Sequence, residues 1–433
     1  MSMDEFERRP GRAISPDDYE DRIGSIEPMA FLPVGSGLSG GDACRNDRGT
    51  LIEGGRHNRI LAFDPGTGVM SCEAGVTLHD ILLRAIPHRF FLPVTAASGF
   101  ATVGGAVASD IHGGNQHARG SFGNHVRRLT LLRSTGERLV CSPDENAGLF
   151  AATIGGLGLT GLILDAELRL MKVPSPHVQR HAIRFDSLDR YFALAESAGD
   201  EHEYAFAWID QLATGRRAGR GVLWAADHAD GACEYPDIPK RLKLALPFSP
   251  SGLFNSATLK ALNEYRFRTQ SPGETVSTEK WTSWFHPFDA LSGWNGLYGR
   301  RGICRHGSVY PAADAPETTA RLLEATRRAG HACVLTRLQR FGDVASRGLL
   351  SFPRPGFSLT LDLADQGEPT VKLLDALDGI VVAAGGAVNS SSDLRMSPKV
   401  FEASFPEWRK LEALRDPAIV SDFWRRTALA LGA

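Results

Sequence analysis

The sequence predicts an α+β protein with two differently built parts, because its texture changes twice along the chain. The first 175 residues are rich in glycine and contain short apolar runs typical of β-strands, such as MAFLPV, RLVCS and LILDAELRL. From about residue 176, strands such as GFSLTLDL alternate with helical stretches such as APETTARLLEATRRAG, which indicates an α+β part built on an antiparallel sheet. The segment SPKVFEASFPEWRKLEALRDP predicts a further, helical part near the C-terminus.

Local signals support individual elements. Thr77 can cap the one clear helix of the first part, and Asp80 three residues later gives the spacing of a capping box. Pro87 ends this helix, whose apolar face consists of Leu78, Ile81, Leu82 and Ala85. A turn around Gly136 joins RLTLLRS and RLVCS into a predicted hairpin. Ser397 is the expected N-cap of the C-terminal helix.

Composition narrows the class of protein. The 433 residues carry 48 basic and 50 acidic side chains without a basic run, so we expect no nucleic-acid partner. No stretch of eighteen apolar residues predicts a transmembrane segment, and the polar, acidic start lacks the order of a signal peptide. We therefore expect a cytoplasmic protein, with peripheral membrane contact left open. Six scattered cysteines without a C-x-x-C pair predict free thiols. No cluster of cysteine and histidine has the spacing of a zinc site, so the sequence predicts no metal.

A dinucleotide fingerprint occurs twice but lacks its usual context. The pattern G-x-G-x-x-G is formed by Gly35, Gly37 and Gly40 and again by Gly156, Gly158 and Gly161. A Rossmann site needs a strand before this pattern and a helix after it. The first copy is followed by GDACRNDRGT, which favours a loop, and the second by LILDAELRL, which predicts a strand. The sequence therefore argues against a nicotinamide Rossmann site.

Glycine-rich loops can also bind phosphate without a helix, because successive backbone N–H groups form an anion-binding nest. The alternative is that the glycines only make tight turns. Five such loops crowd the first part: GSGLSGGD, TVGG, SDIHGGN, GSFGN and IGGLGLTG. This crowding favours an extended nucleotide held by loops of a β-rich domain.

The stretches TVGGAVASDIHGGNQHARGSFGNHVRRLTLL and LFAATIGGLGLTG resemble the PCMH-type FAD-binding domain of the vanillyl-alcohol oxidase superfamily and, within it, the decaprenylphosphoryl-β-D-ribose 2′-oxidase family. The likeness runs from about residue 30 to 427 and includes FHPFD, GWNGLYG and SDLR. It implies a flavin domain of two α/β subdomains over residues 1–175, an inserted α+β substrate domain over 176–385, and a segment 386–433 that returns to the flavin domain.

The resemblance also implies a set of FAD-binding residues. They are Pro33, Val34, Gly35, Ser36, Gly37, Leu38, Ser39, Gly40, Gly41, Asp42, Ala97, Thr102, Val103, Gly104, Gly105, Ser109, Asp110, Ile111, His112, Ile163 and Asn389. Some relatives bind FAD covalently through a histidine in the first loop. Leu38 occupies that place, so we expect non-covalent FAD.

The substrate side departs from the family pattern. Ser392 stands where a lysine beside the flavin is usual, and Gly114 and Gln339 replace two further lysines. Asn389 and Gly40 replace aromatic residues. The remaining changes are Arg305 and Gly307 in place of two glutamines and Thr360 in place of a cysteine. Fewer lysines imply weaker binding of a phosphorylated substrate, and we expect Arg305, Gln339 and Thr360 to contact the substrate.

Alcohol oxidation by a flavin needs a proton acceptor beside the carbon that loses hydride. His112 is the first candidate, although it could simply position the cofactor. His306 is the second candidate, against the alternative of an ordinary pocket or surface histidine. Ser392 and Asp393 follow, and Asp393 could instead bind backbone near FAD.

These observations predict an FAD-dependent oxidoreductase that oxidises a CH–OH group of a sugar-like or sugar-lipid substrate to a ketone, with hydride passing to flavin N5. The ketone could pass to a reductase partner for net epimerisation. Two alternatives stay open. One is a soluble alditol or aldonolactone oxidase, and the other is a flavin-binding protein that has lost alcohol oxidation and performs other chemistry.

Overall fold

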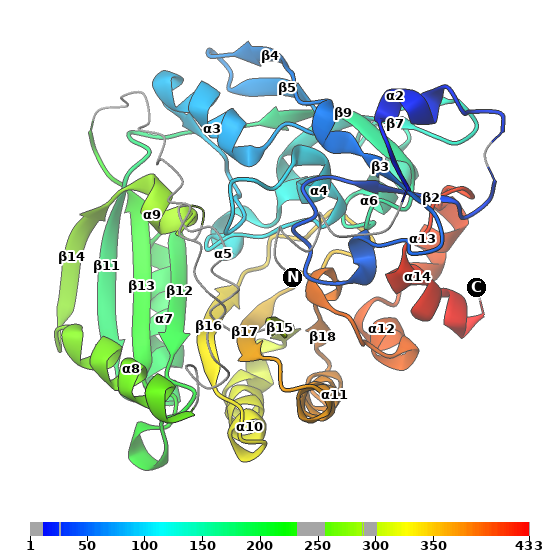
Figure 1. The fold of residues 1–433 in the computed structure, drawn as a ribbon. Helices are drawn as coiled ribbons and strands as arrows, with labels where there is room; N and C mark the ends of the chain where they lie inside the picture. Colours follow the sequence, from blue (N-terminus) through cyan, green and yellow to red (C-terminus); the bar gives the residue numbers. More distant parts are fainter. Residues whose placement is uncertain (1–11, 26, 232–255, 288, 290–300, 433) are drawn as a thin grey trace.

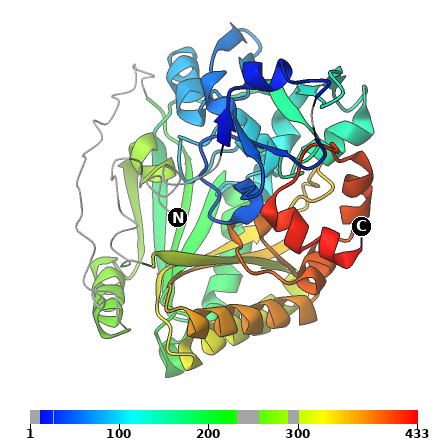
Figure 2. The ribbon, with the colours of Figure 1, turned by 45° about the vertical axis from the view of Figure 1, so that its right-hand side comes forward.

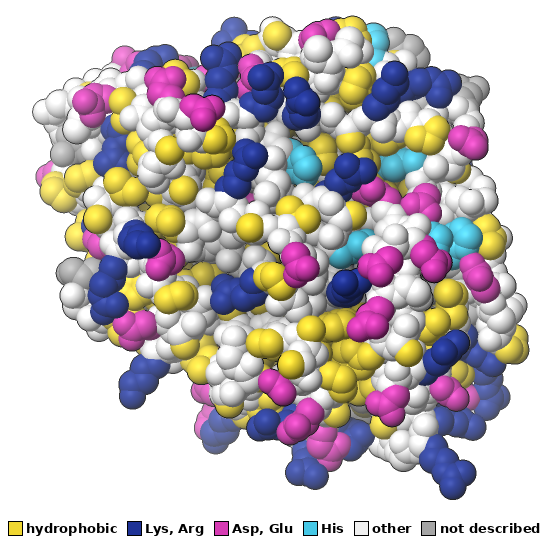
Figure 3. Space-filling model, turned by 180° about the vertical axis from the view of Figure 1, so that it is seen from behind, with side chains coloured by type: hydrophobic (Ala, Val, Ile, Leu, Met, Phe, Trp, Pro, Cys, Tyr) yellow, Lys and Arg dark blue, Asp and Glu magenta, His cyan; other side chains and the backbone are white. Residues whose placement is uncertain are grey.

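The computed structural model describes residues 12–25, 27–231, 256–287, 289 and 301–432, and it is the α+β fold that the sequence predicts. Three sheets, of three, five and two strands, lie in the part of the chain before residue 175, and one large sheet follows them (Figure 1). Among the described residues, no helix is long and apolar enough to cross a membrane. Basic and acidic side chains are interspersed over the face seen in Figure 3, in keeping with the nearly balanced charge of the sequence.

A small parallel sheet carries the first glycine-rich loop. Its strands are β1 (Arg12–Ile14), β3 (Thr50–Glu53) and β2 (Phe31–Val34), in the order β1-β3-β2. Strand β2 is followed by the loop and then by a 3-10 turn at Asp42–Cys44 rather than by an α-helix. The second fingerprint copy leads into strand β9, so neither copy has the Rossmann context.

A five-stranded antiparallel sheet backs this region. Its order is β4 (Ile60–Asp64), β5 (Val69–Glu73), β9 (Leu162–Arg169), β7 (Val126–Leu132) and β8 (Arg138–Cys141). The pair β7–β8 is the hairpin predicted around Gly136. Helices α3 (Leu78–Ala85) and α4 (Val103–Ala108) contribute buried side chains to the same apolar core, and β6 (Phe90–Phe91) pairs with β10 (Met171–Lys172) beside it. The capping box predicted at Thr77 and Asp80 is present.

The second part is an eight-stranded antiparallel sheet. Its order is β14 (Glu274–Glu279), β11 (Val178–Phe185), β13 (Gly221–His228), β12 (Tyr204–Ile209), β16 (Cys333–Phe341), β17 (Gly356–Ala364), β15 (Ile303–Tyr310) and β18 (Ala387–Val388). Three helices and the sheet residues facing them form one apolar core: α7 (Leu188–Glu201), α10 (Ala315–Arg328) and α11 (Glu368–Ala383). Helices α10 and α11 lie side by side under the sheet in Figures 1 and 2. Helix α8 (Ser256–Thr269) packs on the other face over β11, β12 and β13. The part of that face formed by β16, β17 and β15 is therefore the one considered for a ligand.

Strand register fixes which side chains share that other face. Arg337 of β16 pairs with Thr360 of β17, which pairs in turn with Gly307 of β15. Side chains alternate between the two faces of a strand, so residues two positions away share this face. Gln339 and Arg305 therefore flank the row formed by these three residues.

The C-terminal segment returns to the first part of the chain. Helices α12 (Pro398–Ser404), α13 (Trp408–Leu414) and α14 (Asp422–Arg426) bury Phe401, Trp408, Phe423 and Trp424 together. Ser397 caps α12 as predicted. Helix α14 contacts the 3-10 turn after the first glycine loop, and Figure 2 shows the red C-terminal helices beside this blue segment. The remaining helices are α2 (Pro16–Glu20), α5 (Gln116–Arg119), α6 (Ala147–Thr153), α8 (Ser256–Thr269) and α9 (Trp281–Phe285).

Candidate functional site

The loop after strand β2 has the geometry of an anion-binding cradle. Within the described part of the chain, the backbone N–H groups of residues 35–41 donate to no protein acceptor. Gly37 has a φ of +65°, a conformation that glycine adopts without steric cost. Successive unpaired N–H groups around such a residue form a nest that attracts phosphate. The loop therefore fits the pyrophosphate of a dinucleotide cofactor.

Gly35 brings this loop against the glycine-rich stretch that begins at Thr102. A β-carbon on Gly35 would lie 2.1 Å from Thr102 Oγ1, so the close approach requires glycine. The same Oγ1 accepts a hydrogen bond of 3.2 Å from Gly105 N and caps helix α4. Gly104 packs against Ala74, because a β-carbon on Gly104 would lie 3.0 Å from Ala74 Cβ. Two stretches that are distant in sequence thus form one wall of the cradle.

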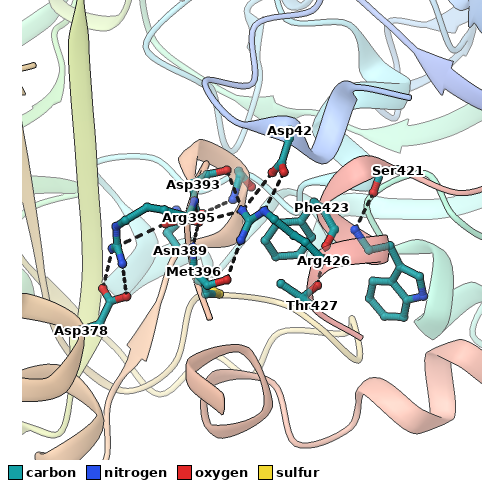
Figure 4. Close-up of polar contacts among 12 residues, drawn as sticks. Asp42, Asp378, Asn389, Asp393, Arg395, Met396, Ser421, Phe423, Arg426 and Thr427 are labelled. Atoms are coloured by element: carbon teal, nitrogen blue, oxygen red, sulfur yellow. Dashed lines mark hydrogen bonds and ion pairs between the residues drawn. The ribbon is translucent and has the colours of Figure 1, made fainter. Parts of the chain in front are cut away.

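Arg426 joins the first loop to the C-terminal segment. Its guanidinium contacts both carboxylate oxygens of Asp42, at 2.6 and 3.0 Å, and donates to Asp393 Oδ1 at 2.9 Å (Figure 4). Asp393 Oδ1 also accepts from the backbone N–H groups of Arg395 and Met396. Oδ1 of the carboxylate predicted as a base is thus occupied by donors, and its Oδ2 lies 3.6 Å from Arg395 Nη2.

Asp110 anchors the end of the second glycine-rich stretch. It accepts hydrogen bonds from Gly123 N at 2.8 Å, Ser121 Oγ at 2.8 Å and Ser351 Oγ at 2.5 Å. Burial raises the pKa of this carboxyl group, and the three hydrogen bonds act in the opposite direction. Because Ile111 and His112 follow directly, these bonds fix where the two side chains point.

The other predicted cofactor residues fall into two groups. Pro33, Val34, Ser36, Ser39, Gly40, Val103 and Ser109 belong to the two stretches that meet at Gly35 and to helix α4 between Thr102 and Asp110. Ile163 is 7% exposed inside the core of the five-stranded sheet, Ala97 lies in an exposed turn, and Leu38 is 41% exposed. Most of the set thus belongs to the two glycine-rich stretches, whereas Ile163 and Ala97 belong to other segments.

His112 lies in an aromatic environment without a polar partner. Its ring centroid is 4.9 Å from that of Phe341 and 5.6 Å from that of Phe352. Within the described residues, no hydrogen bond joins either ring nitrogen to the protein. Burial, with a smaller effect from the charge of Arg337, lowers the pKa of this imidazole to about 4. His112 is therefore neutral at neutral pH and can accept a proton.

His306 does not join this group. It lies next to Arg305 on β15, so its side chain points to the opposite face of the sheet, toward helix α11. There its Nε2 is 3.0 Å from Asp378 Oδ1, and the side chain is 1% exposed. Arg395 binds the same carboxylate at 2.6 and 2.9 Å. His306 is thus an interior residue that holds α11 against the sheet, and we no longer consider it as the proton acceptor.

Asn389 lies at the edge of the row that includes Gly307. Its backbone N–H donates to Gly307 O at 2.8 Å, and a β-carbon on Gly307 would be 3.2 Å from Asn389 Cβ. Its side chain accepts from Ser391 N at 2.9 Å. The side chain of Ser392 lies outside the described residues.

The predicted substrate residues share one face of the eight-stranded sheet. Thr360 lies in the centre, and Gln339 donates from Nε2 to Gly113 O at 2.8 Å. Arg305 forms a two-pronged ion pair with Asp362, at 2.7 and 2.8 Å. The bond to Gly113 places this face directly beside His112, so candidate substrate and cofactor residues meet.

Sequence reasoning missed Arg337, which lies among these residues. Its Cζ is 4.1 Å from the ring centroid of Phe206, and its Nη2 donates to Gln339 Oε1 at 3.1 Å. The alternation in TRLQRF puts positions 337 and 339 on one face and was a signal that could have found it.

Comparison with known proteins gives one match to the flavin-binding part and one match to most of the chain. Residues 25–142 match a family model described as an FAD binding domain. Decaprenylphosphoryl-β-D-ribose oxidase of Mycolicibacterium smegmatis is 32% identical over 91% of this chain and 88% of its own. This chain belongs to that family of PCMH-type FAD-dependent oxidoreductases. FAD is its cofactor, and the glycine cradle is the place where the structure fits it.

Two further relatives show how far the likeness to this oxidoreductase extends. An uncharacterised protein of Streptomyces coelicolor, encoded 5′ of mprA, is 34% identical over 82% of this chain and 100% of its own. L-gulonolactone oxidase of Mus musculus is 32% identical over 46% of each chain. The first two relatives thus match both halves of the oxidoreductase, whereas the lactone oxidase matches less than half.

Proposed function

We propose that this oxidoreductase converts a CH–OH group of a sugar-like or sugar-lipid substrate to a ketone. Bound FAD supplies the hydride acceptor, its N5 atom, in such reactions. The support is the similarity over 91% of the chain to an oxidase of a lipid-linked sugar, because that match includes the eight-stranded sheet. The proposed domains are 1–175 and 386–433 for the flavin and 176–385 for the substrate.

The flavin is held by the two glycine stretches and by Arg426. Unpaired N–H groups of residues 35–41 bind the pyrophosphate, and Thr102 to His112 line the flavin and ribityl region. Asp42 and Asp393 keep the loop closed through Arg426. Leu38 has no side-chain nucleophile, which supports non-covalent FAD.

His112 accepts the hydroxyl proton, and its unpartnered neutral ring is the observation that carries this assignment. A base that is already deprotonated and free of protein partners can receive a hydrogen bond from the substrate hydroxyl. Phe341 and Phe352 exclude water from two sides of the ring. Thr360, Gln339 and Asn389 supply polar groups that orient the remaining hydroxyls.

The first test is a visible spectrum before and after acid precipitation, followed by anaerobic addition of sugar alcohols. We expect yellow protein that releases FAD to the supernatant and a flavin that bleaches with at least one sugar alcohol. The variant H112Q should bind FAD fully and bleach about 10²–10⁴-fold more slowly. Full FAD occupancy without bleaching by any alcohol would instead indicate a flavoprotein with other chemistry.

Reoxidation separates the remaining possibilities for the electron acceptor. We expect the reduced enzyme to pass electrons to a quinone-type dye, as a dehydrogenase does. Rapid reoxidation by O₂ alone would favour the aldonolactone-oxidase type, to which less than half of the chain is similar. The ketone formed would then be reduced by a separate reductase partner for net epimerisation.

A further inference from the structure

Arg337 has no countercharge among the residues that the structure describes. Within the described residues, no carboxylate lies within 4.0 Å of its guanidinium. A single hydrogen bond, from Nη2 to Gln339 Oε1, serves its five N–H groups, and its buried Nε has no partner. A buried, unpaired charge is costly, so proteins keep one chiefly where a ligand completes it.

Arg305, the neighbouring arginine on this face, has a countercharge. Arg305 lies on the same face of the sheet, but Asp362 neutralises it through two bonds of 2.7 and 2.8 Å. Among the described residues of this face, the pair Arg305–Asp362 contributes no net charge, and Arg337 adds one positive charge. One negative charge from a ligand would therefore balance this site.

The surroundings direct Arg337 toward the reaction site. The face of Phe206 supports its guanidinium from one side, and Gln339 ties it to Gly113, next to His112. Gly114 leaves the space that the guanidinium needs, because a β-carbon there would lie 3.3 Å from Nη2. The positive charge and the proposed proton acceptor thus lie close to each other.

We propose that Arg337 binds a carboxylate of the substrate, so that the enzyme oxidises the alcohol of a hydroxy acid such as a sugar acid. This assignment rests on the proposed function, which it narrows to a substrate class. A planar guanidinium matches a carboxylate through two parallel hydrogen bonds. A phosphate monoester dianion would leave the site with excess negative charge, and a neutral sugar would leave Arg337 unpaired. A phosphodiester also carries one negative charge, so the test below compares it with the carboxylate.

Matched ligand pairs test this assignment on the FAD-loaded enzyme without requiring turnover. Glycolate, D-glycerate and D-gluconate are titrated beside ethylene glycol, glycerol and D-glucitol at constant ionic strength, and the perturbed flavin spectrum gives each Kd. We expect at least one acid to bind about tenfold or more tightly than its polyol, which is about 1.4 kcal/mol. Dimethyl phosphate, titrated in the same way, represents the singly charged phosphodiester. The assignment is overturned if it binds more tightly than every acid, or if no acid binds more tightly than its polyol.

Variants separate charge from folding. R337Q should abolish the preference for the acid, and R337K, which keeps the charge but loses the planar fork, should retain part of it. R340Q is the matched control, because Arg340 lies on the same strand but pairs with the exposed Asp200 at 3.0 Å. An unchanged acid Kd in R337Q, with a shifted flavin midpoint potential, would place Arg337 against the flavin and overturn the assignment.

The outcome is distinguishable from failure of the proposed function. Tight, Arg337-dependent binding of an acid without bleaching would support the carboxylate site and contradict alcohol oxidation. Bleaching by neutral polyols, with acids and polyols binding at equal Kd, would support alcohol oxidation and contradict the carboxylate site.

Discussion

Gly41 lies so close to the backbone of Asp393 that a β-carbon on Gly41 would be 2.2 Å from the Asp393 carbonyl oxygen. The neighbouring Asp42 N–H donates to the same oxygen at 3.4 Å. A contact across some 350 positions of sequence thus sets the position of the cofactor loop. No other amino acid fits at position 41 unless the loop or the C-terminal segment moves.

Replacing Gly41 by alanine should therefore weaken FAD binding and stability together. The added methyl group meets backbone atoms, which cannot rotate away, so we expect a loss of about 1–3 kcal/mol in the free energy of unfolding. The absorbance ratio of flavin to protein and the thermal midpoint measure the two effects. G148A is the control, because nothing lies within 4 Å of a β-carbon there. Equal flavin content in both variants would contradict the close contact.

Arg426→Met should release the cofactor loop from the C-terminal helices. The variant leaves Asp42 and Asp393 without their shared partner, and charged hydrogen bonds of this kind contribute about 1.5–3 kcal/mol. We expect a lower thermal midpoint and a higher Kd for FAD, measured by flavin fluorescence. Arg328→Met removes an exposed pair with Glu324 and should change neither quantity measurably. A normal FAD Kd in the Arg426 variant would exclude a role for the bridge.

The pKa of about 4 for His112 predicts an unusual pH profile. Flavin reduction should be constant across pH 6 to 8 and should fall only as the pH approaches 4, where the imidazole takes up a proton. An ordinary histidine would give a limb near pH 6.5. Stopped-flow bleaching at several pH values measures the profile. A limb between pH 6 and 7 would mean that another group accepts the proton.

The same pKa predicts that stability depends on His112 in weak acid. The unfolded chain protonates His112 near pH 6.5, whereas the folded protein does so only near pH 4. The unfolded state therefore binds more protons in this window, and the free energy of unfolding falls as the pH drops through it. H112Q should show a shallower fall in urea titrations between pH 6.5 and 4.

Asp378→Asn should destabilise the packing of α11 on the sheet. Burial alone would raise the pKa of this carboxyl group, but hydrogen bonds from His306 and Arg395 and their charges outweigh burial and lower it. The stabilisation is thus present above the ordinary carboxyl pKa and is lost as the pH falls below it. We expect a loss of about 3 kcal/mol or more at neutral pH in urea unfolding.

Asp375→Asn is the matched control for this variant. Asp375 binds the same Arg395 at 2.9 Å, but its side chain is 63% exposed, so its removal should cost less than about 1 kcal/mol. Equal destabilisation by both variants would show that burial of Asp378 does not matter.

Local elements were predictable because their causes are adjacent in sequence. The capping box at Thr77 and Asp80, the hairpin around Gly136 and the cap at Ser397 each depend on residues within a few positions. The rejection of the Rossmann context also needed only the residues after each glycine motif. The α+β class followed from these elements taken together.

The site was predictable only where a motif carries it. Residues 33–42 and 102–112 were found as motifs, but the Arg426 bridge joins segments whose proximity no local pattern reveals. His306 was a wrong candidate. Alternation along β15 puts Arg305 and His306 on opposite faces of the sheet, but the sequence does not say which of the two faces meets the flavin. Arg337 was not predicted because position 337 lies outside the RFG motif that identified Gln339.

The bridge from Arg426 to Asp42 also constrains when the enzyme can acquire its cofactor in the cell. The ribosome synthesises the glycine cradle before Arg426, which lies almost four hundred residues later in the sequence. A nascent chain therefore presents an open cradle for most of its synthesis. If this cradle binds FAD as proposed, stable flavin binding requires that α14 has been synthesised and packed against the loop.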